Sequence, residues 1–245
     1  MLQLLNINKK YGSVEVLKQL NLTIPKGELL GLIGPNGAGK TTLMNLILSN
    51  LDFEGKILIE DQPNYEYLKT YRDSVVYIPE KLFVYDFLTG LEFVSFILDL
   101  HNISSKKIED KIRILFELFD LTSYKNQLIL NYSFGMKRKI TLIAALVQHP
   151  KLMLLDEPVF GVDARGIIVF KKLLRHLAQT GVTIVLSTHI IDIIKNLCDS
   201  AAILYDKNIV LYEKLDKVST NEIENKYLDL VGCDVDSLIT EFESL

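Results

Sequence analysis

An eight-residue stretch near the N-terminus has the residue types and the spacing of a phosphate-binding loop. The pattern G-x-x-x-x-G-K-[ST] is met at every position by Gly34, Pro35, Asn36, Gly37, Ala38, Gly39, Lys40 and Thr41. Glycines let the backbone curl so that successive NH groups point at phosphate oxygens, and the positive end of a following helix adds to the attraction. Lys40 would reach the β- and γ-phosphates, and the Thr41 hydroxyl would hold Mg²⁺. The stretch predicts a nucleoside triphosphate site.

This loop requires a strand before it and a helix after it. Residues 29–33 are apolar, as in a buried strand, and residues 42–48 have a helical pattern. An ordinary glycine turn before a helix is the alternative, and the complete match in this context disfavours it. Thr42, at the start of the helix, is counted among the predicted nucleotide-binding residues.

Two acids follow an apolar strand later in the chain. Residues 152–155 are apolar and lead into Asp156 and Glu157. In a parallel sheet these carboxylates would lie at the edge where ligands bind. Asp156 is suited to hold Mg²⁺ through its water shell, and Glu157 to orient or deprotonate an attacking water. Solvated acids at a strand end are the alternative reading.

Three further polar residues stand at predicted element ends. His189 follows the strand at 183–186, where an imidazole can hydrogen-bond phosphate or water. Asp163 follows a glycine turn and could simply cap the next helix. Ser133 begins a helix that runs to Val147, and free NH groups at such a start can take an anion. A capped basic helix is the alternative explanation for Ser133.

The composition is that of a globular protein. The chain has 245 residues, 49% of them hydrophobic, with a formal net charge of −4. The absence of a long basic run argues against nucleic acid as the main partner. Cys198 and Cys233 have no C-x-x-C spacing, so we expect neither a disulfide framework nor a zinc site. We therefore expect the protein to work in a reducing cytoplasm. We expect no signal peptide and no membrane-spanning helix, so any work at a membrane would go through a partner or surface docking.

The order of predicted elements indicates an α/β fold with a mainly parallel sheet covered on both faces. An antiparallel strand pair opens the chain, and helical periodicity prevails from Thr89 to His149, with Ile108, Ile112, Leu115, Leu118 and Phe119 on one face. Beyond the strands given above, we predict strands at 2–7, 14–24, 55–59, 75–78, 201–205 and 209–212. After Lys214 the chain turns acidic, and residues 221–230 and 234–242 look like two short helices.

The order of these motifs resembles the ATP-binding subunit of ABC transporters, over nearly the whole chain to about Tyr212. Residues 34–41 look like the Walker A motif of that family, 152–157 like Walker B with its catalytic glutamate, 161–163 like the D-loop, and His189 like the switch histidine. Tyr11 stands where the family stacks an aromatic ring on adenine, although packing in the first hairpin would also explain it.

The resemblance implies a P-loop NTPase core with an N-terminal antiparallel β subdomain and an inserted α-helical subdomain. The ATPase domain would cover residues 1–213, with the helical subdomain at about 80–149. Residues 214–245 would form a short acidic helical extension.

Two motifs depart from the family pattern, the first of them at three positions. The signature L-S-G-G-Q is here Tyr132-Ser133-Phe134-Gly135-Met136, which keeps Ser133 and Gly135 as ATP-binding residues but replaces a glycine with Phe134. Because the backbone should approach ATP closely there, binding across a dimer would be altered. Glu80 replaces the usual glutamine that senses Mg²⁺ and the membrane partner, and its carboxylate can still contact metal or water.

If this chain shares the mechanism of the family, it needs ATP and Mg²⁺ as cofactors. A head-to-tail pair of subunits, homodimer or heterodimer, would enclose two ATP molecules and drive a separate transmembrane permease from the cytoplasmic face of the cell membrane. The Glu80 variant and the tail after the last strand look similar to those of subunits that export drugs, bacteriocins or other peptides, or that give immunity to them. Aromatic residues in 81–87 would dock the membrane subunit or form the core of the helical insert.

Two other functions remain as alternatives. A soluble ABC ATPase could act on ribosomes or nucleic acid, although such proteins usually carry tandem ATPase halves or a basic linker. A regulatory ATP-binding subunit could result if Phe134 weakens one composite site.

Overall fold

The computed structural model describes residues 1–216 and 220–232 of the chain. At its centre is a six-stranded sheet with the strand order β10-β9-β3-β8-β7-β6. All neighbouring strands are parallel except β10, which runs antiparallel to β9. The strands are β3 (Leu29–Ile33), β6 (Val75–Ile78), β7 (Leu152–Asp156), β8 (Thr183–Ser187), β9 (Ser200–Tyr205) and β10 (Asn208–Lys214). The predicted mainly parallel sheet is confirmed.

Alternation along the central strands divides the apolar side chains between two cores. In β7, Met153 and Leu155 belong to the core packed by the helices, whereas Leu152 and Leu154 belong to the other core. Successive side chains of a strand point to opposite faces, so an unbroken apolar run serves both. This explains why the central strands are hydrophobic at nearly every position.

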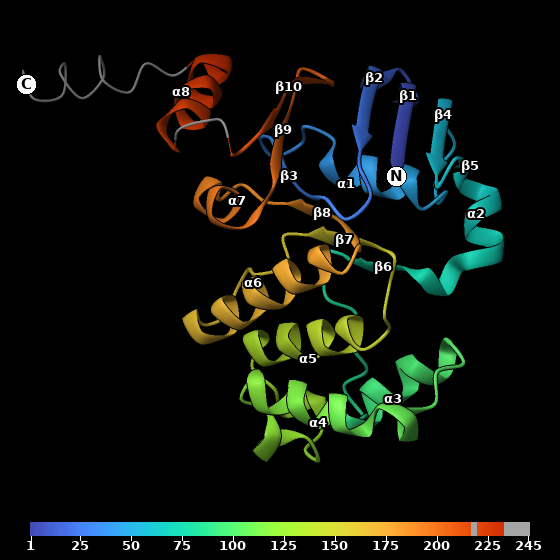
Figure 1. Ribbon diagram of the computed structural model, residues 1–245, viewed down its shortest axis with the longest axis vertical. Helices are drawn as coiled ribbons and strands as arrows, with labels where there is room; N and C mark the ends of the chain where they lie inside the picture. Colours follow the sequence, from blue (N-terminus) through green and yellow to red (C-terminus); the bar gives the residue numbers. More distant parts are fainter. Residues whose placement is uncertain (217–219, 233–245) are drawn as a thin grey trace, which may run out of the picture.

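A smaller antiparallel sheet covers one face of the central sheet, together with helix α1 (Lys40–Ile47) (Figure 1). Its strand order is β2-β1-β4-β5. The strands are β1 (Leu2–Tyr11), β2 (Val14–Ile24), β4 (Glu54–Ile59) and β5 (Gln62–Pro63). The predicted hairpin is confirmed, and its first strand extends four residues past the predicted Ile7 to Tyr11, with register shifts along the pair.

Helix α2 (Asn64–Tyr71) was not predicted. Only Asn64 and Tyr67 of this helix are buried, so its apolar pattern is weak. The Asn64 amide donates to the carbonyl oxygens of Leu46 and Ile47, which attaches α2 to the end of α1. Contacts between distant segments therefore hold this helix, and sequence periodicity does not show them.

The other face of the central sheet is packed by helices (Figure 1). Helices α5 (Phe134–Leu146) and α6 (Ala164–Gln179) lie between the sheet and the pair α3 (Gly90–Leu100) and α4 (Glu109–Leu118). Thr89 and Glu92 form a capping box that begins α3. The predicted apolar face is confirmed, since Ile112, Leu115 and Phe119 are buried and Ile108 and Leu118 pack against them. Short 3-10 turns at Arg72–Ser74, Ser105–Ile108, Thr122–Tyr124 and Ile129–Asn131 connect these elements.

The described C-terminal part contains helices α7 (Ile191–Leu197) and α8 (Thr220–Val231). The predicted helix at 221–230 corresponds to α8, whereas the one predicted at 234–242 lies outside the described residues. Lys195 of α7 forms an ion pair with Glu224 of α8 (2.7 Å). Within the described residues, we find no helix that is both long and apolar enough to span a membrane.

The central sheet brings the predicted chemical groups to one edge. Strands β3, β7 and β8 run parallel, and Ser187 pairs with Asp156 on one side and with Leu32 on the other. The loops that follow these three strands therefore open at the same end, which is where ligands bind in parallel α/β sheets.

The packing of α7 on β3 depends on a residue without a side chain. A Cβ atom on Gly31 would lie 2.5 Å from Cγ2 and 2.8 Å from Cγ1 of Ile194, so α7 packs directly on the strand backbone.

We predict that Gly31→Ala lowers the free energy of unfolding by about 1–3 kcal/mol through overpacking, as measured by thermal unfolding. Ile194→Ala alone should also destabilise, but the double variant should lose less than the two single losses combined. Strictly additive losses would contradict this packing.

Candidate nucleotide-binding site

The loop between β3 and α1 has the backbone geometry that its sequence predicts. Gly37 and Gly39 have φ angles of 82° and 105°, which glycine adopts at little cost. Lys40 is 8% exposed, and its Nζ donates to the carbonyl oxygens of Gly34 (2.6 Å) and Pro35 (3.2 Å). Burial lowers the pKa of Lys40, and the carboxylates of Glu157, Asp156 and Glu80 oppose that shift. A positive charge is thus held inside the loop.

The Asp156 carboxylate joins the loop to the central sheet. It is 1% exposed, and its Oδ2 accepts a hydrogen bond from the Thr41 hydroxyl (2.5 Å). The hydroxyl of Ser187 donates to the other oxygen, Oδ1. Two of the three predicted Mg²⁺ ligands, Thr41 and Asp156, are therefore in direct contact.

Glu157 is held by donors from the loop after β8. His189 Nδ1 lies 2.8 Å from its Oε1, the His189 backbone NH donates to the same oxygen (3.0 Å), and the Thr188 hydroxyl donates to Oε2 (3.1 Å). Glu157 also has a φ of 46°, a conformation that is costly for a residue with a side chain. Such backbone strain is often found at functional sites. The two predicted catalytic residues thus share one hydrogen-bonded cluster.

A pocket of about 380 Å³ opens beside these groups. Its lining combines the phosphate loop with the strand-end acids and the histidine: Asn36, Gly37, Lys40, Thr41, Glu80, Asp156, Glu157, Phe160 and His189. Phe160 is the one lining residue that sequence reasoning missed, because an aromatic residue in a loop carries no motif of its own. Burial raises the pKa of nearby Tyr77 to about 12, with Asp156 as the next cause, so this phenol stays neutral beside the pocket.

Other predicted binding residues lie outside the pocket lining. Ser133 caps helix α5 by accepting a hydrogen bond from the Met136 NH (3.3 Å). Asp163 caps α6 through the Gly166 NH (2.7 Å), and its carboxylate pairs with Lys139 (2.5 Å). The Lys139 bond is the main reason why the pKa of Asp163 is lowered. The remaining predicted residues outside the lining are Tyr11, Gly34, Pro35, Ala38, Gly39, Thr42 and Gly135.

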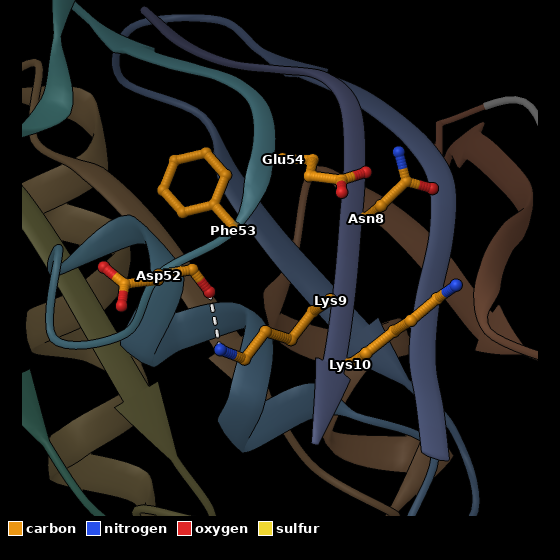
Figure 2. A pocket seen from close by; sticks show the side chains of 6 residues that line it. All are labelled: Asn8, Lys9, Lys10, Asp52, Phe53 and Glu54. Atoms are coloured by element: carbon orange, nitrogen blue, oxygen red, sulfur yellow. Dashed lines mark hydrogen bonds between the residues drawn. The ribbon is translucent and has the colours of Figure 1, made fainter. Parts of the chain in front are cut away.

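Tyr11 ends strand β1 with 47% of its surface exposed. The Lys9 ammonium lies 5.0 Å from the centre of its ring and donates to the carbonyl oxygen of Asp52 (2.5 Å). Figure 2 shows that Lys9 points toward Asp52 whereas Lys10 points the other way, in a second pocket of about 310 Å³. The Lys9 ammonium therefore lies against one face of the Tyr11 ring.

Phe134 and Phe160 form an aromatic contact beside the nucleotide pocket. Their ring centres are 6.0 Å apart and the rings are nearly perpendicular, at 81°. The Phe134 ring also lies over Gly161, where a Cβ atom would approach it within 2.6 Å. Both rings remain at least half exposed. The side chain that replaces a glycine in the signature sequence thus packs against the segment after Glu157.

The fold and the site together define a P-loop nucleotide-binding protein. The sequence model of the ABC transporter family matches residues 17–160, which include the phosphate loop and both strand-end acids. The chain belongs to this ABC transporter ATP-binding family and is an ATPase of the ABC type.

Named relatives agree with this assignment. The chain is 30% identical to the lantibiotic transport ATP-binding protein SrtF of Streptococcus pyogenes, over 88% of this chain and 92% of SrtF. It is 33% identical to the bacitracin transport ATP-binding protein BcrA of Enterococcus faecalis, over 84% of this chain. It is 34% identical to YdbJ of Bacillus subtilis, an uncharacterized ABC transporter ATP-binding protein, over 83% of this chain. The matched segment spans 66% of the length of BcrA and of YdbJ.

Solved structures share the fold. The ATP-binding subunit of an ABC transporter superimposes with a TM-score of 0.83 at 28% identity and covers 98% of both chains. The ATP-binding cassette MJ0796, solved as a dimer in a post-hydrolysis state bound to ADP and Pi, gives a TM-score of 0.78 at 26% identity, over 88% of this chain and 99% of that one.

The Glu157 cluster generates a test of its predicted role. We predict that Glu157→Gln retains ATP binding but lowers steady-state ATP turnover by about 100-fold or more, the contribution typical of a general base. The amide keeps the shape of the side chain but cannot accept a proton from water. Glu66→Gln on α2 is the matched control and should turn over ATP normally. Normal turnover by the Glu157 variant would refute the role.

Proposed function

We propose that Thr41 and Asp156 hold Mg²⁺ when ATP is bound in the pocket. Both supply hard oxygen donors, which Mg²⁺ prefers, and their direct contact places these donors side by side. Glu80 lines the same pocket and offers a second carboxylate. When bound, Mg²⁺ would supply positive charge that neutralises the phosphates.

ATP hydrolysis would use the residues at the strand ends. Lys40 and the NH groups of the phosphate loop would bind and orient the phosphates. Glu157 would accept the proton of the attacking water, with His189 and Thr188 holding its carboxylate in place. His189 keeps 56% of its side chain exposed while it contacts Glu157, so its ring is accessible to water. The observation that carries this proposal is the convergence of Lys40, Glu157 and His189 on one pocket.

A second ATPase subunit would complete the site. Ser133 and Gly135 lie outside the pocket lining of their own chain, so a head-to-tail partner would have to bring its signature segment to the bound ATP. MJ0796, which shares the fold, was solved as a dimer. The pair would be a homodimer or a heterodimer.

A separate membrane subunit would dock beside the pocket. The segment 81–87 was predicted to be either a docking surface or part of the core. Phe83, Tyr85 and Phe87 are 69%, 55% and 84% exposed, which favours docking. Tyr85 packs edge-on against Phe96 of α3 at 5.2 Å, so the segment is fixed to the helical part. Exposed aromatic side chains next to packed ones are typical anchors for a protein partner.

The transported substrate would be a peptide antibiotic or a similar compound, moved outward. Two relatives are named for the transport of lantibiotics and of bacitracin. The chain would then work at the cytoplasmic face of the cell membrane, attached through its membrane subunit.

The proposal is tested by capturing the protein from detergent-solubilised native membranes. We expect tagged Glu157→Gln protein, with ATP present, to retain a polytopic membrane protein, because blocked hydrolysis would trap the closed complex. The triple variant that also carries Phe83→Ser and Phe87→Ser should lose it. Recovery of ribosomes or nucleic acid without a membrane protein would instead support the soluble alternative.

The Phe134 contact tests whether the signature segment binds across a dimer. We predict that Phe134→Gly raises ATP turnover and ATP-dependent dimerisation, because it removes a ring from a place where the backbone should approach ATP. Dimerisation is measured by light scattering in the Glu157→Gln background. Phe96→Leu, on α3, is the control for loss of a half-exposed ring. Unchanged turnover and dimerisation would show that the ring does not obstruct closure and would also disfavour a regulatory subunit with a weakened site.

A further inference from the structure

Helix α5 contains a fully buried arginine that the predicted mechanism does not use. Arg138 is 0% exposed. Its Nη1 donates to the carbonyl oxygen of Pro79 (3.0 Å) and its Nη2 to that of Glu80 (2.7 Å). The Nε atom has no hydrogen-bond partner among the described residues. A buried charge is costly unless it is paired, so the contacts that Arg138 makes must compensate for its burial.

The two carbonyl groups belong to the segment that leads to the pocket. Pro79 and Glu80 directly follow strand β6, and Glu80 lines the nucleotide pocket. A guanidinium group is planar and presents its donors as a rigid fork. Bonds from both of its terminal nitrogens to successive carbonyls fix the orientation of the two peptide units that flank Glu80. They therefore set the direction in which the Glu80 side chain leaves the main chain.

Arg138 is also coupled to the pocket through charge. Burial lowers the pKa of its guanidinium, and the carboxylates of Glu80, Asp156 and Glu157 oppose that shift. These three carboxylates line the pocket. The acidic groups of the site thus offset part of the cost of burying this charge, although Arg138 itself does not line the pocket.

The same residue connects the pocket to the start of α5. The guanidinium carbon lies 6.0 Å from the centre of the Phe134 ring, one turn earlier on the helix. Phe134 contacts Phe160, which lines the pocket as Glu80 does. Helix α5 therefore contacts two separate walls of the pocket, one through Arg138 and one through Phe134.

We propose that Arg138 is a positioning residue that holds Glu80 in the geometry needed to bind Mg²⁺ with ATP. It acts through the main chain of Pro79 and Glu80 rather than by touching nucleotide. This proposal rests on the proposed function of the pocket. It adds Arg138 of α5 as the residue that holds the main chain at Glu80.

The test is a double-mutant cycle on the full chain. ATP affinity is measured by calorimetry over a range of Mg²⁺ concentrations for wild type, Arg138→Gln, Glu80→Gln and the double variant. We expect each single variant to need about tenfold more Mg²⁺ for half-maximal ATP binding, as is typical when a group that orients a metal ligand is lost. The double variant should need no more than the worse single variant, because both changes remove one function.

Two further variants separate positioning from folding. Arg138→Lys keeps the charge but has no planar fork, so it should fold and show a smaller shift in the same direction. Arg175→Gln removes a half-buried arginine that pairs with Asp199 (2.5 Å) outside the pocket, and it should leave the Mg²⁺ dependence unchanged even where it lowers the unfolding temperature.

Several results would overturn the proposal. One is a lower unfolding temperature for both Arg138 variants with wild-type Mg²⁺ dependence, which would make the arginine merely structural. Another is a double variant whose shift is the product of the single shifts. A third is a Glu80→Gln variant that behaves like wild type, which would refute the route through Glu80 while ATP binding itself persists. Failure of the wild type to bind ATP would instead refute the proposed function.

Discussion

The site depends on one buried carboxylate. Asp156 ends the central strand β7, and its two oxygens accept hydrogen bonds from Thr41 at the start of α1 and from Ser187 at the end of β8. A carboxylate that is 1% exposed needs such donors to offset its desolvation. The bonds join three segments that are distant in sequence. Lys40 precedes Thr41 and the Glu157 cluster follows Asp156, so the positions of both depend on this carboxylate.

Charge is concentrated around this point. Glu80, Asp156 and Glu157 line the pocket, and the buried cations Lys40 and Arg138 lie close enough for these carboxylates to favour their charged forms. Charges interact more strongly where protein has replaced water. The pocket thus combines positive charge that would attract phosphates with carboxylate oxygens that would attract a divalent cation.

Helix α5 is the element through which distant parts of the molecule reach the site. Its first half contacts the Pro79–Glu80 segment through Arg138, the Phe160–Gly161 segment through Phe134 and the cap of α6 through Lys139. A packed helix moves as a unit, because its interior contacts tolerate little deformation. A shift of α5 would therefore change several of these contacts together.

The sequence by itself determined the phosphate loop, the strand-end acids, the mainly parallel sheet and the family. These features are local: a fixed spacing of glycines and lysine, or an apolar run ending in Asp156 and Glu157, has its meaning within a few residues. Only the tertiary structure decided which residues meet. In the folded chain, His189 and Thr188 donate hydrogen bonds to Glu157, and the Arg138 guanidinium donates to the Glu80 carbonyl. Ser133 and Gly135 lie outside the pocket lining of their own chain. Phe83 and Phe87 are exposed. The reason is that such contacts join segments separated by tens of residues, and their geometry follows from sheet order and helix packing rather than from any pattern along the chain.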